Sequence, residues 1–281
     1  MNNSNLNGAG EVFSNLDAQN AQNNGAEDTN LDSNLNSEKQ DSRPKLAYIL
    51  PNFFTASSAF LGVISVLCAS RGDYDKAIIY IVFSLILDGM DGRVARLTKT
   101  TSKFGVEFDS LADLVAFGVA PAMLFYFSVG HTFGKFGSLV AALFVVFGAI
   151  RLARFNVTTG TYEPNVFIGL PIPSAAITAA FWVGIYENYG FLHGHEWILS
   201  LIMAVLSILM VSNVRYPSFK KINYAKANFL RLLIALLLAF SLLYVYPLES
   251  ATAAISVYIV YGVVRGVWVM FFAKNIKLKK E

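Results

Sequence analysis

Apolar stretches of bilayer length recur along the chain from Leu46 almost to its C-terminal end. An α-helix rises about 1.5 Å per residue, so about 20 apolar residues cross the hydrocarbon core of a membrane. Runs of this kind lie near 46–69, 74–95, 107–130, 136–154, 168–187, 196–212, 228–247 and 251–273. Their length and number predict an all-α protein, a polytopic transmembrane helical bundle of about eight spans.

Composition divides the chain into three expected parts. Hydrophobic residues make up 55% of the whole and charged residues 15%, whereas soluble domains carry about 25% charged residues. Residues 1–42 are instead rich in Asn, Asp, Ser and Gly, which predicts a disordered polar tail. We expect a transmembrane domain over 43–273 and a basic cytoplasmic tail over 274–281. The net charge of +3 is too small to indicate nucleic-acid binding.

Lysine and arginine are distributed unevenly between the expected spans. They gather before the first span, after every second span and at the C-terminus, while the alternate connections carry few or balanced charges. These cations are Arg43, Lys45, Arg93, Arg96, Lys99, Lys103, Arg151, Arg154, Arg215, Lys220, Lys221, Lys226, Arg231, Lys274, Lys277, Lys279 and Lys280. Basic connections stay in the cytoplasm, so both termini are expected to be cytoplasmic.

Four aspartates stand at the cytoplasmic ends of the second and third expected spans: Asp88, Asp91, Asp109 and Asp113. A carboxylate near the middle of a lone transmembrane helix costs about 2.5–3.5 kcal/mol, so these acids need partners. At about 100° per residue, the two acids of each helix share one helix face. Helices joined by a short connection lie side by side. We therefore expect the four acids to face one another in a cleft that opens to the cytoplasm.

Such a cluster is suited to divalent cations. Four carboxylates carry a charge of about −4 at neutral pH, which two divalent cations would balance. Oxygen ligands without a nearby His or Cys favour magnesium or manganese over zinc. A site with two such ions is suited to displacement at phosphorus. Arg96 could add positive charge near the phosphates, and Asn52 and Thr55 could supply hydrogen bonds from the first span.

Two other interpretations remain open. The acids could be solvated and pair with Arg93, Arg96 or Lys103, which would set topology without chemistry. They could also belong to a divalent-cation transporter, although the clustering of all four at one end argues against a path through the membrane. Metal uptake without any displacement reaction at phosphorus would favour transport.

The acids belong to a longer pattern over residues 88–113, which reads D-x-x-D-G-x-x-A-R, eight residues, then G-x-x-x-D-x-x-x-D. It matches the signature of the CDP-alcohol phosphotransferase family at every fixed position, and the chain resembles that family. Three further segments resemble its bacterial serine-transferring branch. They read PNFFT at 51–55, RLARFN at 151–156 and FIGLPIPSAA at 167–176.

The resemblance implies a role for each matching residue. Asp88 and Asp109 would bridge two magnesium or manganese ions, Asp91 would complete the first ion and Asp113 the second. Asp113 would also be the catalytic base that deprotonates the attacking hydroxyl. The residues that would contact the CDP part of CDP-diacylglycerol are Asn52, Thr55, Gly92, Arg96 and Ser102.

The implied reaction transfers the phosphatidyl group of CDP-diacylglycerol to L-serine and releases CMP. The resemblance places it in the inner (cytoplasmic) membrane of a bacterium, with the active site facing the cytoplasm, and in a homodimer. Arg151 and Arg154 share a helix face, and a guanidinium there could bind the serine carboxylate. The same pair could bind the phosphate of glycerol 3-phosphate, as in a phosphatidylglycerophosphate synthase, or merely satisfy the positive-inside rule.

Overall fold

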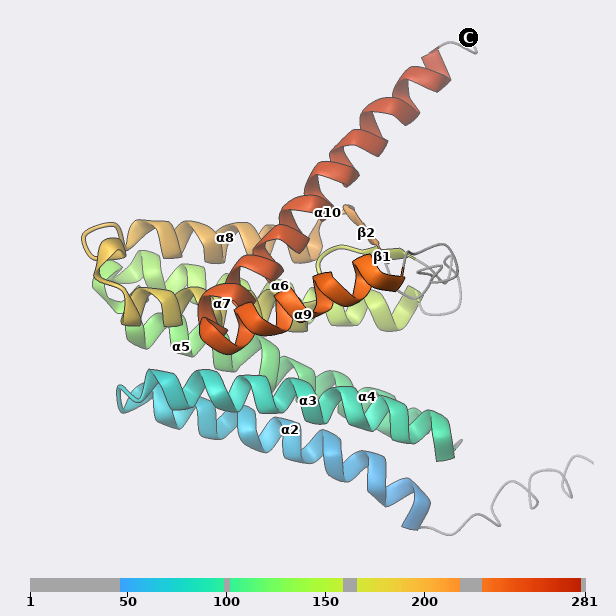
Figure 1. The fold of residues 1–281 in the computed structure, drawn as a ribbon. Helices are drawn as coiled ribbons and strands as arrows, with labels where there is room; N and C mark the ends of the chain where they lie inside the picture. The colour runs from blue at the N-terminus through green and yellow to red at the C-terminus, as the bar shows by residue number, and fades with distance from the viewer. Residues whose placement is uncertain (1–45, 99–101, 159–165, 218–228, 279–281) are drawn as a thin grey trace, which may run out of the picture. The chain divides into compact units, whose positions relative to one another are not determined.

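The computed structural model describes residues 46–98, 102–158, 166–217 and 229–278. The chain divides into two units, Met1–Ala47 and Tyr48–Glu281, and nearly all of the described residues belong to the second. Figure 1 shows its helices as coiled ribbons. The polar tail expected over 1–42 and the last three residues of the expected basic tail lie outside the described residues.

Helices dominate the described chain, and eight long helical segments stand where eight apolar runs were expected. They are α2 (Leu46–Ser70), α3 (Tyr74–Thr98), the continuous run of α4 (Lys103–Asp113), η1 (Leu114–Val119) and α5 (Ala120–Ser128), α6 (Lys135–Thr158), α7 (Ile172–Asn188), α8 (Trp197–Val211), α9 (Phe229–Val245) and α10 (Pro247–Leu278). Short 3₁₀ turns, η2 (Gly130–Phe133) and η3 (Gly190–Leu192), lie between some of them. The predicted all-α class is confirmed for these residues. Helix α10 continues into the segment that was expected to be a basic tail.

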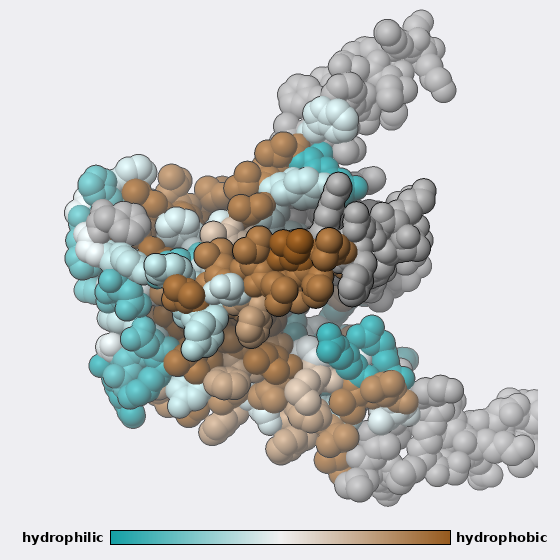
Figure 2. Space-filling model, viewed as in Figure 1, coloured by the Kyte–Doolittle hydropathy of each residue, from teal (hydrophilic) through white to brown (hydrophobic). Residues whose placement is uncertain are grey.

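Four described segments are long and apolar enough to cross a membrane. They are Ile49–Ser70, Lys103–Ser128, Lys135–Thr158 and Pro247–Gly266. Helix α8 and the apolar part of α9 are shorter. In Figure 2 apolar side chains cover the middle of the visible face, and polar residues gather at its left end. This is the build of a membrane protein.

Buried hydroxyl groups join α2 to α3. Ser58 donates a hydrogen bond to the backbone oxygen of Ser84 at 3.1 Å, and Ser65 donates to that of Ala77 at 2.8 Å. All four residues are buried, so these contacts satisfy donors that would otherwise be lost from water. The two helices are thereby held in one register, with the acidic end of α3 beside the start of α2.

Helix α2 also approaches the turn η1 backbone to backbone. A Cβ atom added to Gly62 would lie 2.7 Å from the Cα atom of Ala116, so a larger side chain at 62 would force the two segments apart. The turn η1 is π-helical and begins directly after Asp113. Single π-helical turns in α-helices occur frequently at functional sites.

A short two-stranded ribbon was not foreseen by the sequence analysis. Strand β1 (Val166–Ile168) pairs antiparallel with β2 (Arg215–Pro217), with Phe167 opposite Tyr216. The apolar run from 168 was expected to be helical from its start. The helix begins instead at Ile172, because the proline before it lacks the amide hydrogen of an earlier helical turn and takes an extended ψ of 136°.

Candidate active site

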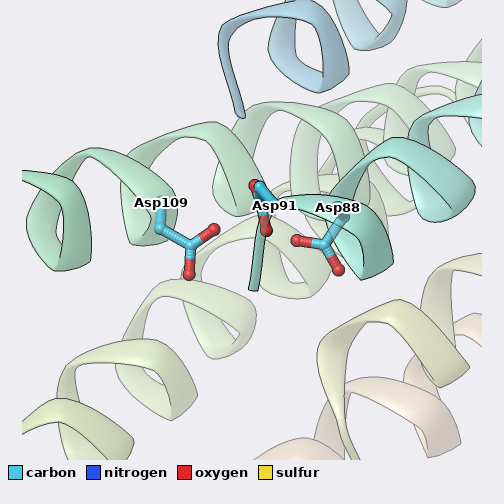
Figure 3. A group of neighbouring side chains, drawn as sticks. All are labelled: Asp88, Asp91 and Asp109. Carbon is cyan, nitrogen blue, oxygen red and sulfur yellow. The ribbon is translucent and has the colours of Figure 1, made fainter. Parts of the chain in front are cut away.

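Three carboxylates meet between α3 and α4. Asp88 and Asp91 lie one turn apart on α3, and Asp109 lies on α4. One oxygen of each lies within 4.8 Å of the others, and Figure 3 shows the three side chains converging. The spacing of three residues places the first two on one helix face, as the sequence pattern predicted. The helix pair brings the third to meet them.

Asp113 extends this group to a fourth carboxyl. It ends α4, one turn after Asp109, and its carboxyl group lies within hydrogen-bonding contact of that of Asp88. Because the π-helical turn starts at the next residue, Asp113 is the last side chain that keeps the α-helical spacing from Asp109. The four acids that the motif singled out therefore lie side by side.

The acid cluster has few partners of its own. Thr55 on α2 donates a hydrogen bond from Oγ1 to Oδ2 of Asp91 at 2.7 Å. Oδ1 of Asp109 is buried and accepts no hydrogen bond from any described residue. None of the four acids forms an ion pair within the described chain. Pairing with Arg93, Arg96 or Lys103, the alternative left open by the sequence, therefore finds no support in the described contacts.

This donor set fits a divalent cation. The converging atoms are all carboxylate oxygens, which magnesium and manganese prefer. A buried carboxylate oxygen without a partner is costly, and a cation beside Asp109 would remove that cost. Like charges this close also repel one another unless a cation or a proton lies between them.

Polar groups expected to contact CDP gather at the N-terminus of α4. Ser102 caps the helix and accepts a hydrogen bond from the amide of Gly105 at 3.0 Å. A Cβ atom on Gly105 would lie 3.4 Å from Oδ1 of Asn52, so Asn52 reaches the same place from α2. A helix N-terminus presents free amide groups to an anion, and a phosphate would be favoured there.

Two other expected CDP contacts lie on α3. The side chain of Arg96 is exposed and donates from Nε to the backbone oxygen of Gly92 at 2.8 Å, within its own helix. Gly92 is exposed too, and a Cβ atom added there would meet nothing within 4 Å. This side of the cluster is thus open to a bulky ligand.

The two arginines of the RLARFN segment have different surroundings. Arg151 on α6 is buried, with 8% of its surface exposed, and interacts electrostatically with Asp113. Its guanidinium lies 5.3 Å from the ring centre of Phe155. Arg154 donates hydrogen bonds to the C-terminal end of α8 and the residues that follow it. Of the two, Arg151 is therefore the one near the acids.

Two contacts beside the acids were not foreseen from the sequence. Thr55 was expected to contact CDP, and in the structure its hydroxyl donates a hydrogen bond to Asp91. Asn156 was not singled out, and its amide group donates to Oγ of Ser110 at 2.9 Å, next to Asp109 on α4. The only sequence feature that pointed to Asn156 was its position in the RLARFN segment. Only the packing of α6 on α4 reveals the contact.

Comparison with known proteins identifies the class to which this arrangement belongs. Residues 48–211 match the sequence model of the CDP-alcohol phosphatidyltransferase family. The chain belongs to that family.

Individual relatives give a more particular likeness. The CDP-diacylglycerol–serine O-phosphatidyltransferase of Helicobacter pylori strain J99 is 52% identical over 81% of this chain and 96% of its own length. The archaetidylserine synthase of Methanothermobacter thermautotrophicus is 38% identical over 60% of this chain and 69% of its own. A CDP-diacylglycerol–serine O-phosphatidyltransferase of Mycobacterium tuberculosis is 34% identical over 64% of this chain and 66% of its own.

The Thr55–Asp91 hydrogen bond yields a first prediction. Thr55→Val keeps the branched shape of the side chain but removes the donor, so Asp91 loses the group that orients its carboxylate. We expect the affinity for Mn²⁺ to fall by about tenfold or more, the usual effect of losing such a support. Titration of the purified protein with Mn²⁺, followed by electron paramagnetic resonance, measures it.

Thr178→Val is the matched control for this experiment. Thr178 is equally buried but bonds only to a backbone oxygen of its own helix, that of Ser174 at 2.7 Å. Its variant should bind Mn²⁺ like the parent. Equal affinities in both variants would contradict the role assigned to Thr55.

Proposed function

We propose that this protein transfers the phosphatidyl group of CDP-diacylglycerol to the hydroxyl of L-serine, giving phosphatidylserine and CMP. The observation that carries the proposal is the likeness to serine O-phosphatidyltransferases along most of the chain, the acid cluster included. The chain would be active in the inner membrane of a bacterium, as a homodimer. Its eight helical segments would span the bilayer, with both termini and the acid cluster on the cytoplasmic side.

The proposed roles of the acids follow their positions. Asp88 and Asp109 would contact two magnesium or manganese ions, with Asp91 on the first ion and Asp113 on the second. The ions, when bound, would neutralise the pyrophosphate and stabilise the charge that develops on the departing CMP. Asp113 would accept the proton of the serine hydroxyl as the hydroxyl oxygen bonds to the phosphatidyl phosphorus. The bond from that phosphorus to the CMP oxygen breaks.

CDP-diacylglycerol would lie with its head group at the start of α4. Ser102 and Asn52 flank the N-terminus of that helix, which attracts phosphate. Arg96 and Gly92 bound the open side of the cluster. The acyl chains would stay among the apolar helices, so the lipid need not leave the bilayer during the reaction.

Arg151 is proposed to bind the carboxylate of serine. Within the described chain it has no ion pair and no hydrogen bond, although it is largely buried. A buried guanidinium that donates no hydrogen bond is costly, and a carboxylate would accept two parallel hydrogen bonds from it. Binding there would place the serine beside Asp113, with which Arg151 interacts electrostatically.

Release of CMP by the purified protein tests the proposal. CDP-diacylglycerol and Mg²⁺ or Mn²⁺ are supplied with serine, glycerol 3-phosphate or inositol phosphate in turn. We expect release with serine alone, because Arg151 offers one carboxylate-binding group beside the base. Release driven by glycerol 3-phosphate instead would support the phosphatidylglycerophosphate synthase reaction. Metal uptake into vesicles, without CMP release from CDP-diacylglycerol in the presence of any acceptor, would support a transporter.

A further inference from the structure

The C-terminal end of α8 is bound by a side chain from another helix. The last four backbone oxygens of any helix lack partners within it. In α8 the last two, those of Met210 and Val211, accept hydrogen bonds from Arg154 at 3.3 and 2.9 Å. The same guanidinium donates to the backbone oxygen of Ser212 at 3.3 Å and to Oδ1 of Asn213 at 3.4 Å. A positive charge is also favoured at a helix C-terminus.

These contacts occupy the terminal guanidinium nitrogens, which a bound carboxylate would need as hydrogen-bond donors. An arginine has five N–H groups, of which four are on its two terminal nitrogens. Each terminal nitrogen of Arg154 donates twice, once to one of the last two backbone oxygens of α8 and once to a residue just after the helix. A serine carboxylate bound by both nitrogens would have to displace helix-capping hydrogen bonds. The geometry therefore favours a structural partner for Arg154 over a substrate.

Gly169 lies directly against the guanidinium of Arg154. Its φ of +78° lies in the left-handed region, and its amide donates to the backbone oxygen of Val214 at 2.9 Å. A Cβ atom there would lie 2.6 Å from Nη2 of Arg154 and 2.4 Å from the backbone oxygen of Met210. Any other residue would be strained and would press on the guanidinium. Arg154 thus fits between α8 and the segment that leads from β1 to α7.

Arg154 lies one turn beyond Arg151 on α6. Fixing Arg154 to α8 therefore fixes the rotation of this end of α6, and with it the direction in which Arg151 faces Asp113. We propose that Arg154 is a positioning residue that anchors α6 to α8, and that Arg151 alone binds the acceptor carboxylate. This proposal rests on the proposed function. It assigns serine binding to Arg151 and helix anchoring to Arg154, whereas the sequence alone suggested the same role for both arginines.

Steady-state kinetics of the full chain in detergent test the separate roles of Arg151 and Arg154. Arg151→Ala should raise the serine KM by about tenfold or more, the loss expected for a charged hydrogen bond, without lowering the melting temperature. Arg154→Ala should lower kcat and the melting temperature, while the serine KM stays within about twofold. Arg154→Lys should resemble the alanine variant, because one ammonium group cannot make the four bonds of a fork-shaped guanidinium. Arg71→Ala, at an exposed arginine of the α2–α3 turn, is the matched control.

A double-mutant cycle with Gly169→Ala adds a measurement that does not depend on turnover. Both substitutions disturb one contact, so the combined loss of melting temperature should be smaller than the sum of the separate losses. A rise in serine KM in Arg154→Ala equal to that in Arg151→Ala, with kcat retained, would overturn the proposal. Strict additivity with Gly169→Ala would overturn it too. If the parent protein released no CMP with serine, the proposed function would fail, and the thermal cycle would still decide the Arg154 contact.

Discussion

Asp113→Asn should lower the kcat of serine-dependent CMP release by a factor of about 10²–10⁴, the usual contribution of a general base. Asparagine has the shape of aspartate and keeps an oxygen toward the cluster, but it cannot take the proton of the serine hydroxyl. Affinity for CDP-diacylglycerol should change little, because Ser102 and Asn52, at the other end of α4, remain in place. Initial rates at saturating serine, together with a direct lipid-binding measurement, separate the two effects.

Glu107→Gln provides the control for this variant. Glu107 lies on the same helix, is exposed, and is not one of the converging acids, so its loss changes the helix charge equally without touching the cluster. It should keep the parental rate. Near-parental kcat in Asp113→Asn would remove the assignment of Asp113 as the base. The loss should be the same with any acceptor alcohol that the enzyme uses, since every acceptor must lose a proton.

The acid cluster could be predicted from the sequence because local geometry determines most of it. Asp88 and Asp91 are separated by three residues and Asp109 and Asp113 by four, and both spacings place two side chains on one helix face. The short connection between the helices leaves them little choice but to lie side by side. Four of the helical segments were predictable for a similar reason, since their apolar length alone identifies them, whereas α8 is shorter.

Contacts between distant segments could not be predicted in this way. Arg151 and Arg154 share a helix face, and no local rule says which of them meets the acids. Their partners depend on where α8 ends beside α6, a packing detail that helix periodicity does not encode. The hydroxyl of Thr55 likewise had two possible targets, and only the register between α2 and α3 directs it to Asp91. The ribbon also pairs two segments that are distant in the sequence, β1 and β2, and no local rule predicts such a pairing.

Asp109→Asn should abolish both the stabilisation by divalent cations and the activity that depends on them. In the parent protein the four carboxylates form no ion pair with any described side chain and repel one another, so bound Mg²⁺ or Mn²⁺ should stabilise the fold. Saturation at 100 times the dissociation constant supplies about 2.7 kcal/mol. For a chain of this size we expect the melting temperature to rise by about 5 °C or more. The asparagine variant should show little of this rise.

The same substitution should raise the stability of the metal-free protein. It removes one of the mutually repelling charges, and the amide group can donate a hydrogen bond to a neighbouring carboxylate. Without divalent cations the variant should therefore melt above the parent, and with them below it. Melting curves of both proteins, recorded with Mn²⁺ and with a chelator, give the four melting temperatures to compare. If the variant gained as much from Mn²⁺ as the parent, Asp109 would not be a ligand. If the parent melted above the variant without divalent cations, the cation would not stabilise the parent by relieving repulsion between the acids.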